Sequence, residues 1–331
     1  MIPPSLDERL LLLFFGLGLE VLLGGTRGLF RLIPHPVVLA GRAVTAFDRK
    51  LNRPQRSEGA RRFRGIVTVL VLVPAAAGIG WFVAVTCQQS TSGLVAEALI
   101  VAILLAYRGL HDHVLAVAVA LARHGILAGR QAVSHIVGRN PASLDAAGVA
   151  RAAIESLAEN FSDGVIAPAF WFLLLGLPGL FAYKMANTLD SMIGHKTPQY
   201  RAFGWAAARF DDLANLVPAR LSGVLLALTA LFARDAMASR AFRVMLRDAR
   251  RHRSPNAGWP EAAVAGALGL ALGGPREYVG ERVDGPWLGE GSARVTPEDI
   301  IRALGLYRLA GMILAGLLLG GWLAAHLTLL V

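Results

Sequence analysis

GIVTVLVLVPAAAGIGWFVAV, residues 65–85, is an uncharged stretch of 21 residues that decides the fold class. A helix needs about 20 apolar residues to cross a bilayer, so this stretch predicts a transmembrane helix. The segment before it, residues 41–64, carries seven arginines and Lys50 against Asp48 and Glu58, a charge of +6. Positively charged segments tend to stay in the cytoplasm. The chain is therefore expected to leave the cytoplasm at residue 65.

Two further apolar stretches are expected to span the membrane. Residues 310–331 contain no Asp, Glu, Lys or Arg over 22 residues. Residues 94–107 are interrupted only by Glu97, and the helix can continue through residues 114–122. With residues 65–85, these stretches predict a polytopic protein built from helices.

The apolar stretch at residues 165–183 is long enough to cross the membrane, but Gly176, Pro178 and Gly179 interrupt its middle. Such a cluster breaks a helix. A full crossing would also place the basic residues of 184–220 outside the cell, against the charge rule. We therefore predict a re-entrant helical hairpin here, which returns residues 184–220 to the cytoplasmic face.

Composition supports the same class. Of the 331 residues, 55% are hydrophobic and 17% are charged, whereas soluble domains have roughly 25% charged residues. We predict an all-α, polytopic membrane protein with polar helices on the cytoplasmic side, forming one membrane-embedded domain over residues 1–331 in the inner or plasma membrane. The net charge of +10 fits cytoplasmic loops and contact with membrane lipid. A nucleic-acid partner is not expected, because no recognised nucleic-acid module occurs.

Polar residues that could carry chemistry gather in residues 139–220. The first cluster is RAAIESLAENFSD, residues 151–163. Arg151, Glu155, Glu159 and Asp163 follow one another at four-residue spacing, which places them in one stripe on a helix, with Asn160 nearby. Carboxylates of this kind suit Mg²⁺ bound together with substrate phosphates. A solvated face with salt bridges is the structural alternative.

The second cluster is YKMANTLDSMIGHKT, residues 183–197. Lys184, Asn187 and Ser191 share one helical face, Asp190 lies beside it, and Gly194 is expected to end the helix. A lysine and an aspartate in this setting suit combined phosphate and metal binding. Ordinary capping and loop roles are the alternative.

The third cluster is ARFDDLANLVPAR, residues 208–220. Asp211, Asp212 and Asn215 fall within a helical arc of about 100°, and Arg209 and Arg220 flank them. Paired carboxylates with flanking arginines again indicate a metal and phosphate site. An internal salt-bridge network is the alternative. The sequence contains no P-loop, no Ser-His-Asp arrangement and no HExxH motif.

These residues resemble the adenosylcobinamide-phosphate synthase family of corrinoid biosynthesis, a group of polytopic membrane enzymes. The resemblance rests on HPVVLAGR (35–42), SHIVGRNPASLDAAGVARAAIESLAENFSDGVIAPAFW (134–171), GLPGLFAYKMANTLDSMIGHKTPQYRAFGWAAARFDDLANLVPARL (176–221), SPNAGWPEAAVAGALGLALGG (254–274) and YVGERVDGPWLG (278–289). It covers most of the chain.

The resemblance implies an amide ligase that joins adenosylcobyric acid to aminopropanol or its phosphate, using ATP and Mg²⁺, with its active site on the cytoplasmic side. We predict catalytic roles for Glu155, Glu159, Asp211 and Asp212. Metal binding is predicted for Glu159, Asp163 and Asp190. ATP binding is predicted for Asn160, Lys184, Asn187, Ser191, Arg209, Asn215 and Arg220.

Two other functions remain open on the residues alone. Broken apolar segments with polar residues at membrane depth also occur in transporters. A non-catalytic membrane sensor of the same superfamily is the second alternative. The position of most carboxylates in polar segments disfavours a transporter, and the presence of all three acidic clusters disfavours a sensor.

Overall fold

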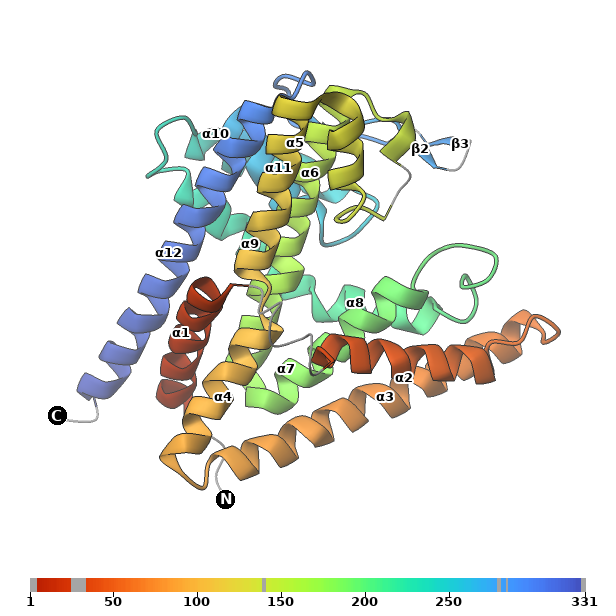
Figure 1. Cartoon of the computed structure of the whole chain (residues 1–331), viewed down its shortest axis with the longest axis vertical. Coiled ribbons are helices and arrows are strands. Elements are labelled where there is room, and N and C mark those ends of the chain that lie inside the picture. Colours follow the sequence, from red (N-terminus) through yellow and green to blue (C-terminus); the bar gives the residue numbers. More distant parts are fainter. Residues whose placement is uncertain (1–4, 25–33, 139–140, 279–280, 284, 329–331) are drawn as a thin grey trace. The chain divides into compact units, whose positions relative to one another are not determined.

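The computed structural model describes residues 5–24, 34–138, 141–278, 281–283 and 285–328, and the fold is mostly helical (Figure 1). The α-helices are α1 (Leu6–Leu23), α2 (Pro36–Leu51), α3 (Glu58–Cys87), α4 (Thr91–Leu104), α5 (Tyr107–Val133), α6 (Ala146–Phe161), α7 (Ala167–Ile193), α8 (Trp205–Ala214), α9 (Leu216–Thr229), α10 (Ala238–Asp248), α11 (Gly258–Leu268) and α12 (Pro297–Thr328). Short 3₁₀ turns cover Pro141–Ser143 and Ala249–Arg251, and a π-helical turn covers Ser162–Ile166.

Two short antiparallel strand pairs accompany the helices. β1 (Leu272–Gly273) pairs with β4 (Trp287–Leu288), and β2 (Arg276–Tyr278) pairs with β3 (Glu281–Val283). The predicted helical, polytopic architecture is confirmed, and the two short strand pairs accompany it.

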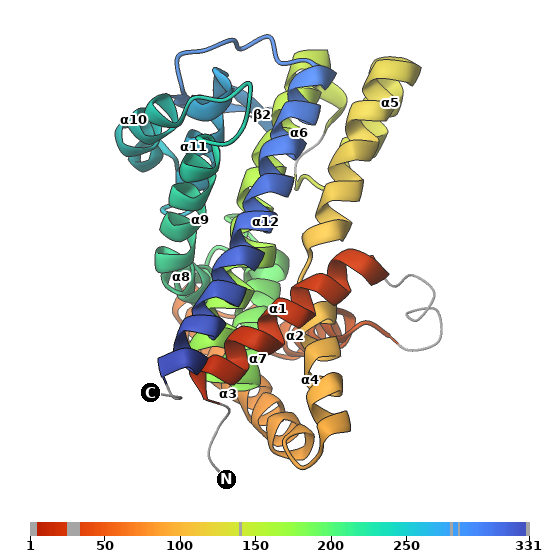
Figure 2. The same cartoon turned by 90° about the vertical axis from the view of Figure 1, so that its left-hand side faces the viewer.

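The chain forms two compact units, neither of which is one continuous stretch of sequence. The first unit comprises residues 1–106, 167–215 and 317–331, and the second comprises residues 107–166 and 216–316. In the first unit, α3 packs against α7, α2 and α8, and α1 packs against α4 (Figure 2). In the second unit, α11 packs against α9, α10 and α6, and α5 packs against α6.

Within the described residues, four helical segments are long and apolar enough to cross a membrane: Glu58–Cys87, Thr91–Val133, Ala146–Ile193 and Pro297–Leu327. The expected spans at residues 65–85 and 94–107 lie in the first two, and the described part of 310–331 lies in the last, so these predictions are confirmed. α1 is not among them, since its 18 residues include Asp7, Glu8, Arg9 and Glu20.

The predicted break in the apolar stretch at 165–183 is confirmed. Gly176 adopts φ 66° and ψ −153° inside α7, and Pro178 follows it. A positive φ of this kind suits glycine. The bent helix pair that could form a broken span or re-entrant loop lies later in the chain, however, and consists of α8 and α9. The return of residues 184–220 to the cytoplasmic face stays a prediction.

The half of α7 that follows the break is amphipathic and is anchored in the first unit. Ala186, Leu189 and Ile193 are buried in a core shared with Val69 and Leu72 of α3. Residues 184, 187 and 191 lie on the other side of the helix because of the 3.6-residue repeat. The packing of the apolar face therefore fixes where the polar face of α7 points.

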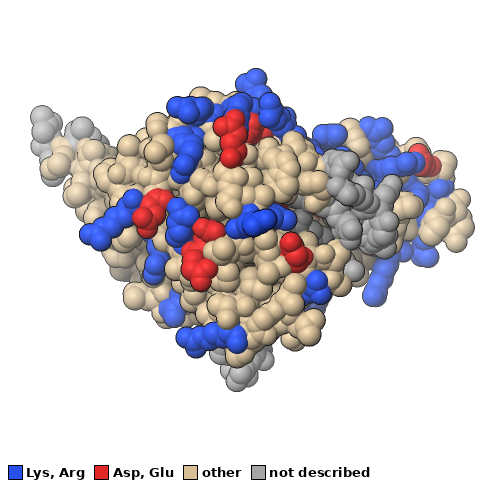
Figure 3. Space-filling model, turned by 90° about the horizontal axis from the view of Figure 1, so that it is seen from above, with Lys and Arg blue, Asp and Glu red and all other residues tan. Residues whose placement is uncertain are grey.

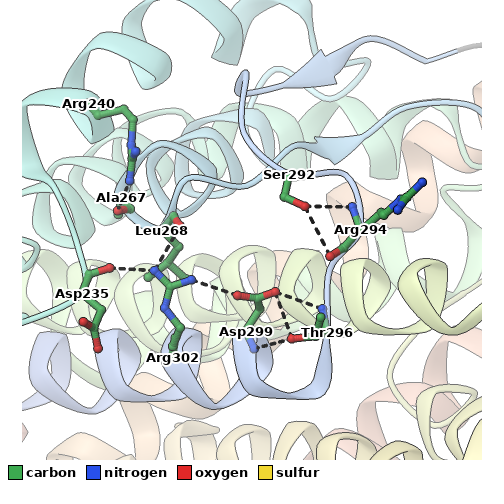
Figure 4. A network of polar contacts seen from close by, with 9 residues as sticks. All are labelled: Asp235, Arg240, Ala267, Leu268, Ser292, Arg294, Thr296, Asp299 and Arg302. Atoms are coloured by element: carbon green, nitrogen blue, oxygen red, sulfur yellow. Dashed lines mark hydrogen bonds and ion pairs between the residues drawn. The ribbon is translucent and has the colours of Figure 1, made fainter.

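In the second unit, two arginines cap the C-terminal end of α11 (Figure 4). The guanidinium of Arg240 donates to the carbonyls of Gly266 (2.5 Å) and Ala267 (3.1 Å). Arg302 of α12 donates to the carbonyls of Leu268 (3.1 Å) and Asp235 (2.8 Å). Cations are favourable at this end of a helix because its last carbonyls lack helical partners.

The arginine-rich segment at residues 234–253 includes residues with protein partners. Arg247 forms ion pairs with Asp248 (2.6 Å) and with Glu290, and Arg251 lies 3.3 Å from Asp248. Asp248 is fully buried and also accepts a bond from the backbone N–H of Gly289 (2.9 Å). α10 is thus held by ion pairs as well as by its apolar face.

Candidate active site

Three aspartates from α7 and α8 gather in the first unit. Their carboxylates lie close enough to interact electrostatically. The charge of Asp212 acts on Asp190, and the charges of Asp190 and Asp212 both act on Asp211. Asp211 is 7% exposed, and the other two carboxylates are half-buried. The structure therefore joins the second and third sequence clusters into one acidic site, which we call the α7–α8 carboxylate site (Asp190, Asp211 and Asp212).

Asp211 is the most enclosed member of this site. Its Oδ2 accepts a 3.0 Å hydrogen bond from the side-chain amide of Asn215, whose own Oδ1 accepts from the Tyr183 hydroxyl at 3.0 Å. Asn187 of α7 is a further neighbour of the carboxylate. Oδ1 of Asp211 is buried without a hydrogen-bond partner. A buried carboxylate oxygen with no partner is costly unless a cation or donor binds it.

The two flanking arginines have different surroundings. Arg209 forms an ion pair with Asp212, with 3.2 Å between Nη1 and Oδ2, and 62% of the Arg209 side chain is exposed. An exposed pair of this kind contributes little to stability. Arg220 bonds to the backbone carbonyl of Leu216 (2.7 Å) and to Oδ1 of Asn256 (3.1 Å), and its guanidinium lies 4.8 Å from the ring centroid of Trp259. None of these Arg220 partners is a carboxylate.

The polar face of α7 carries Lys184, Asn187 and Ser191. Lys184 and Asn187 are half-buried, and Ser191 is exposed. Lys184 lies near His35, the residue that caps α2 by accepting a bond from the N–H of Val37. Burial lowers the pKa of His35, and the positive charge of Lys184 lowers it further. His35 is therefore neutral at pH 7, and a cationic lysine beside it adds positive charge to this face.

A preassembled metal cage is not seen in the part of the chain that the structure describes: no group of three or more His, Cys, Asp or Glu side chains could hold a metal ion. Mg²⁺, however, usually binds one or two protein carboxylates and takes its remaining ligands from water and substrate phosphates. The unpartnered Oδ1 of Asp211, with Asp190 beside it, fits that pattern.

The first sequence cluster lies in the second unit, and its members differ in burial. Glu155 is 6% exposed, and its Oε1 accepts a 2.7 Å bond from the backbone N–H of Gly273 in β1. Arg151 contacts the carbonyl of Ala293 (2.5 Å) and the ring of Trp287. Glu155 thus has a defined contact that holds β1 against α6.

The remaining members of that cluster lie around the end of α6. Glu159 and Asn160 are exposed, and the Asn160 amide donates to the carbonyl (2.9 Å) and hydroxyl (3.2 Å) of Ser156. Asp163 is half-buried within the π-helical turn Ser162–Ile166. Such turns occur often at functional sites because they redirect side chains out of the regular helical repeat.

Two buried groups in the second unit were missed by the sequence reading. Nε2 of His252 lies 3.9 Å from Oε1 of Glu261, and their side chains are 9% and 3% exposed. His252 precedes the SPNAGWPEA segment (254–262), and Glu261 lies within it; the same segment supplies Asn256 and Trp259 to Arg220. Glu261 lies in the first turn of α11. Acidic residues are common there because they interact favourably with the helix dipole. The sequence offers no signal of the burial of Glu261.

Comparison with known proteins gives consistent results. The sequence profile of the family described as CobD/Cbib protein matches residues 13–307. The chain is 49% identical over 323 residues to the cobalamin biosynthesis protein CobD of Brucella anthropi, covering 95% of this chain and 99% of that protein. It is 51% identical over 303 residues to the protein of the same description from Rhizobium meliloti, covering 91% and 93%. For the Rhodobacter capsulatus protein, the identity is 46% over 300 residues, covering 90% and 93%.

No solved structure matches this chain. The family profile nonetheless spans the three acidic clusters and both compact units, and the relatives are covered over nearly their whole length. The helical, membrane-spanning fold agrees with the resemblance noted from the motifs. The chain belongs to the CobD/CbiB family of cobalamin biosynthesis proteins.

Proposed function

We propose that this protein is an ATP-dependent amide ligase that joins adenosylcobyric acid to aminopropanol or to aminopropanol phosphate. Membership of the CobD/CbiB family supports a role in cobalamin biosynthesis. The observation that carries the chemistry is the α7–α8 carboxylate site, where a buried aspartate oxygen lacks a partner beside a lysine-bearing helical face. Such an arrangement suits a cation and phosphate groups together.

The reaction must activate a carboxylate before an amine can displace one of its oxygens. The corrinoid carboxylate attacks the γ-phosphorus of ATP, and ADP leaves. The amine then attacks the acyl carbon of the resulting acyl phosphate, and orthophosphate leaves with the carboxylate oxygen. The amine arrives protonated at pH 7 and gives up a proton before it attacks. The protein's task is to position these groups and to neutralise phosphate charge.

In the first unit, Asp190 and Asp211 are the residues best placed to hold Mg²⁺, which supplies charge neutralisation on phosphate oxygens. Asn215 and Tyr183 orient Asp211 through their hydrogen bonds. Lys184, Asn187 and Ser191 form the face that binds ATP phosphates. Asp212, half-buried and paired with the exposed Arg209, is the candidate base.

In the second unit, Arg220 is the candidate phosphate-binding arginine. Its charge faces an amide, a carbonyl and an indole ring, and a guanidinium can bind phosphate through two parallel hydrogen bonds. Glu159, Asn160 and Asp163 form an exposed to half-buried polar edge that suits a further phosphate or metal contact. Glu155 is assigned the positioning of β1 through its bond to Gly273.

We further propose that both units work as one synthase domain over residues 1–331, in the inner or plasma membrane, with the active site on the cytoplasmic side. The unbroken family match over residues 13–307 supports a single functional domain. One face of the protein carries many more Lys and Arg than Asp and Glu side chains (Figure 3), which suits a cytoplasmic surface near anionic lipid.

The test is product analysis with the purified protein in detergent. Adenosylcobyric acid, ATP and Mg²⁺ are combined with aminopropanol or aminopropanol phosphate, and the products are identified by mass spectrometry. The proposal requires a condensed amide and an ATP consumption that depends on both the acid and the amine. ATP consumption without condensation, or no consumption with either amine, would remove the ligase assignment and leave a transporter or sensor.

A further inference from the structure

The break in α7 leaves backbone carbonyls without helical donors. Pro178 has no N–H, so the carbonyl of Leu174 has no donor four residues ahead. Gly176 has non-helical dihedral angles, which also takes the carbonyl of Leu173 out of the regular ladder. Unpaired carbonyls at membrane depth are costly, so another group has to supply the hydrogen bonds.

Arg9 of α1 supplies them. Its Nη1 donates to the carbonyl of Leu173 at 3.1 Å and to that of Leu174 at 2.8 Å. Its Nε lies 3.9 Å from the position that a Cβ on Gly176 would take. All these residues belong to the first unit, so a side chain from the first helix ends the first half of α7.

Glu97 of α4 is a buried polar group near Arg9. It is fully buried, and both of its carboxylate oxygens lack a hydrogen-bond partner, as does Nε of Arg9. Arg9 is the cation that acts on Glu97 electrostatically. The close packing of α1 on α4, where Gly16 meets Val101, keeps the two side chains in the same region.

The angle at this break determines where the second half of α7 carries its polar face. Asp190 lies 14 residues beyond Gly176, which is about 21 Å along a helix at 1.5 Å per residue. A change of about 5° at the break therefore moves Asp190 by about 2 Å. Misplacement by about 1 Å can slow a positioned reaction by about 10²-fold.

α3 also restrains this region. A Cβ on Gly80 would lie 2.6 Å from the carbonyl oxygen of Leu177, so the two backbones touch immediately after the break. Leu177 is fully buried. α3 thus holds the start of the second half of α7, while Arg9 holds the end of the first half.

We propose that Arg9 is a positioning residue that fixes the angle of the α7 break and thereby the place of Lys184, Asn187 and Asp190. The claim that Arg9 positions reacting groups rests on the proposed function, whereas the claim that Arg9 fixes the angle of the break does not. The two parts are therefore measured separately, the angle by a distance within α7 and the reaction by kinetics.

The distance measurement uses spin labels on cysteines at Leu175 and Ser191, two exposed positions on either side of the break, in a Cys87→Ser background in detergent. With Arg9 present, the distribution is expected to be narrow. Arg9→Ala is expected to shift or broaden it by several ångströms. Glu8→Gln is the matched control, because Glu8 belongs to the N-terminal capping box of the same helix and Gln can preserve that box. An unchanged distribution in Arg9→Ala would overturn the proposal whether or not the protein forms product.

The kinetic measurement compares unlabelled variants with intact Cys87. Arg9→Ala is expected to lower kcat at least tenfold and to raise several-fold the Mg²⁺ concentration that gives half-maximal rate. Arg9→Lys, which keeps the charge and a donor, is expected to recover part of kcat, and Glu8→Gln is expected to match the wild type. A changed distance distribution with unchanged kcat and Mg²⁺ dependence would overturn the positioning role. If the wild-type protein forms no condensed product, the proposed function is contradicted. The role of Arg9 in fixing the angle of the break is then judged from the distance measurement alone.

Discussion

Asn215 donates a hydrogen bond to Oδ2 of Asp211 and leaves Oδ1 of the same buried carboxylate without a partner. Removing the charge with Asp211→Asn is expected to lower product formation by at least roughly tenfold, or about 1.4 kcal/mol of transition-state stabilisation. The melting temperature should stay the same or rise, because an unpaired buried charge is lost. Asp112→Asn, which alters an exposed pair with Arg108, is the matched control for turnover. A large fall in melting temperature would instead assign Asp211 a structural role.

Asp163 and Asp190 are predicted to bind metal. Asp163→Asn and Asp190→Asn are each expected to lower turnover by more than roughly tenfold while expression and membrane insertion stay near normal. Both changes remove charge with little change in volume. Steady-state rates measured over a range of Mg²⁺ concentrations check this prediction. Near-wild-type turnover of both variants at saturating Mg²⁺ would contradict the metal-site assignment.

Arg220 is expected to bind phosphate, whereas the exposed ion pair of Arg209 is expected to matter little. Arg220→Lys should raise KM for ATP or for aminopropanol phosphate several-fold with a nearly unchanged melting temperature, because lysine lacks the forked donors of arginine. Arg209→Lys serves as the control and should change both quantities little. If only the KM for the phosphorylated amine rises, Arg220 contacts that phosphate. An unchanged KM for both substrates, with a lowered melting temperature in Arg220→Ala, would favour a structural role.

Asp248 is expected to make stability depend on pH. Burial alone raises the pKa of this carboxyl, but the hydrogen bonds from Arg247 and the N–H of Gly289, with the charge of Arg251, lower its pKa overall. A lowered pKa in the folded state stabilises the protein above the unfolded value of about 3.9, and that contribution is lost as pH falls through the folded pKa. Melting temperatures of the wild type and Asp248→Asn in detergent should therefore differ at pH 7 and converge below pH 4. A difference that stays constant over that range would contradict the prediction.

Residues 184–220 are predicted to face the cytoplasm. The prediction rests on their basic content and on the break at Gly176. A single cysteine placed at the exposed Pro198, in a Cys87-free background, should react with an impermeant reagent only after the cells are opened. A cysteine at Gln89, in the turn after α3, is the control expected on the outer side. Labelling of the Pro198 position in intact cells would contradict the predicted topology.

The sequence was informative where the bilayer imposes a simple requirement. The span within α3 and the break at Gly176 follow from length, charge and backbone chemistry, and the structure confirms both. The meeting of Asp190 with Asp211 and Asp212 was not predicted as one site, because it depends on how α8 packs on α7. Helical periodicity predicts which residues share one face of a helix, but it does not predict which neighbouring helix that face contacts.

Other contacts lay beyond sequence reasoning for a similar reason. The bond between Glu155 and Gly273 joins residues 118 positions apart, and nothing in the local pattern of either segment indicates it. In the sequence, Arg9 is an ordinary charged residue near the start of an apolar helix, yet its side chain donates hydrogen bonds to backbone carbonyls more than 160 residues away. These roles arise only after α1, α6 and α7 have been assembled.

Residues 235–268 leave the ribosome before Arg302, and this order has a consequence for folding during synthesis. Until α12 emerges, the carbonyls of Leu268 and Asp235 lack the donors that Arg302 provides in the finished protein. α10 and α11 can pair earlier, because Arg240 is already present to hold the carbonyls of Gly266 and Ala267. The carbonyl of Leu268, the last residue of α11, is therefore expected to gain its donor only when the chain is nearly complete. A nascent chain arrested before residue 302 should show the Leu268 end of α11 as the accessible part of an otherwise folded helix pair.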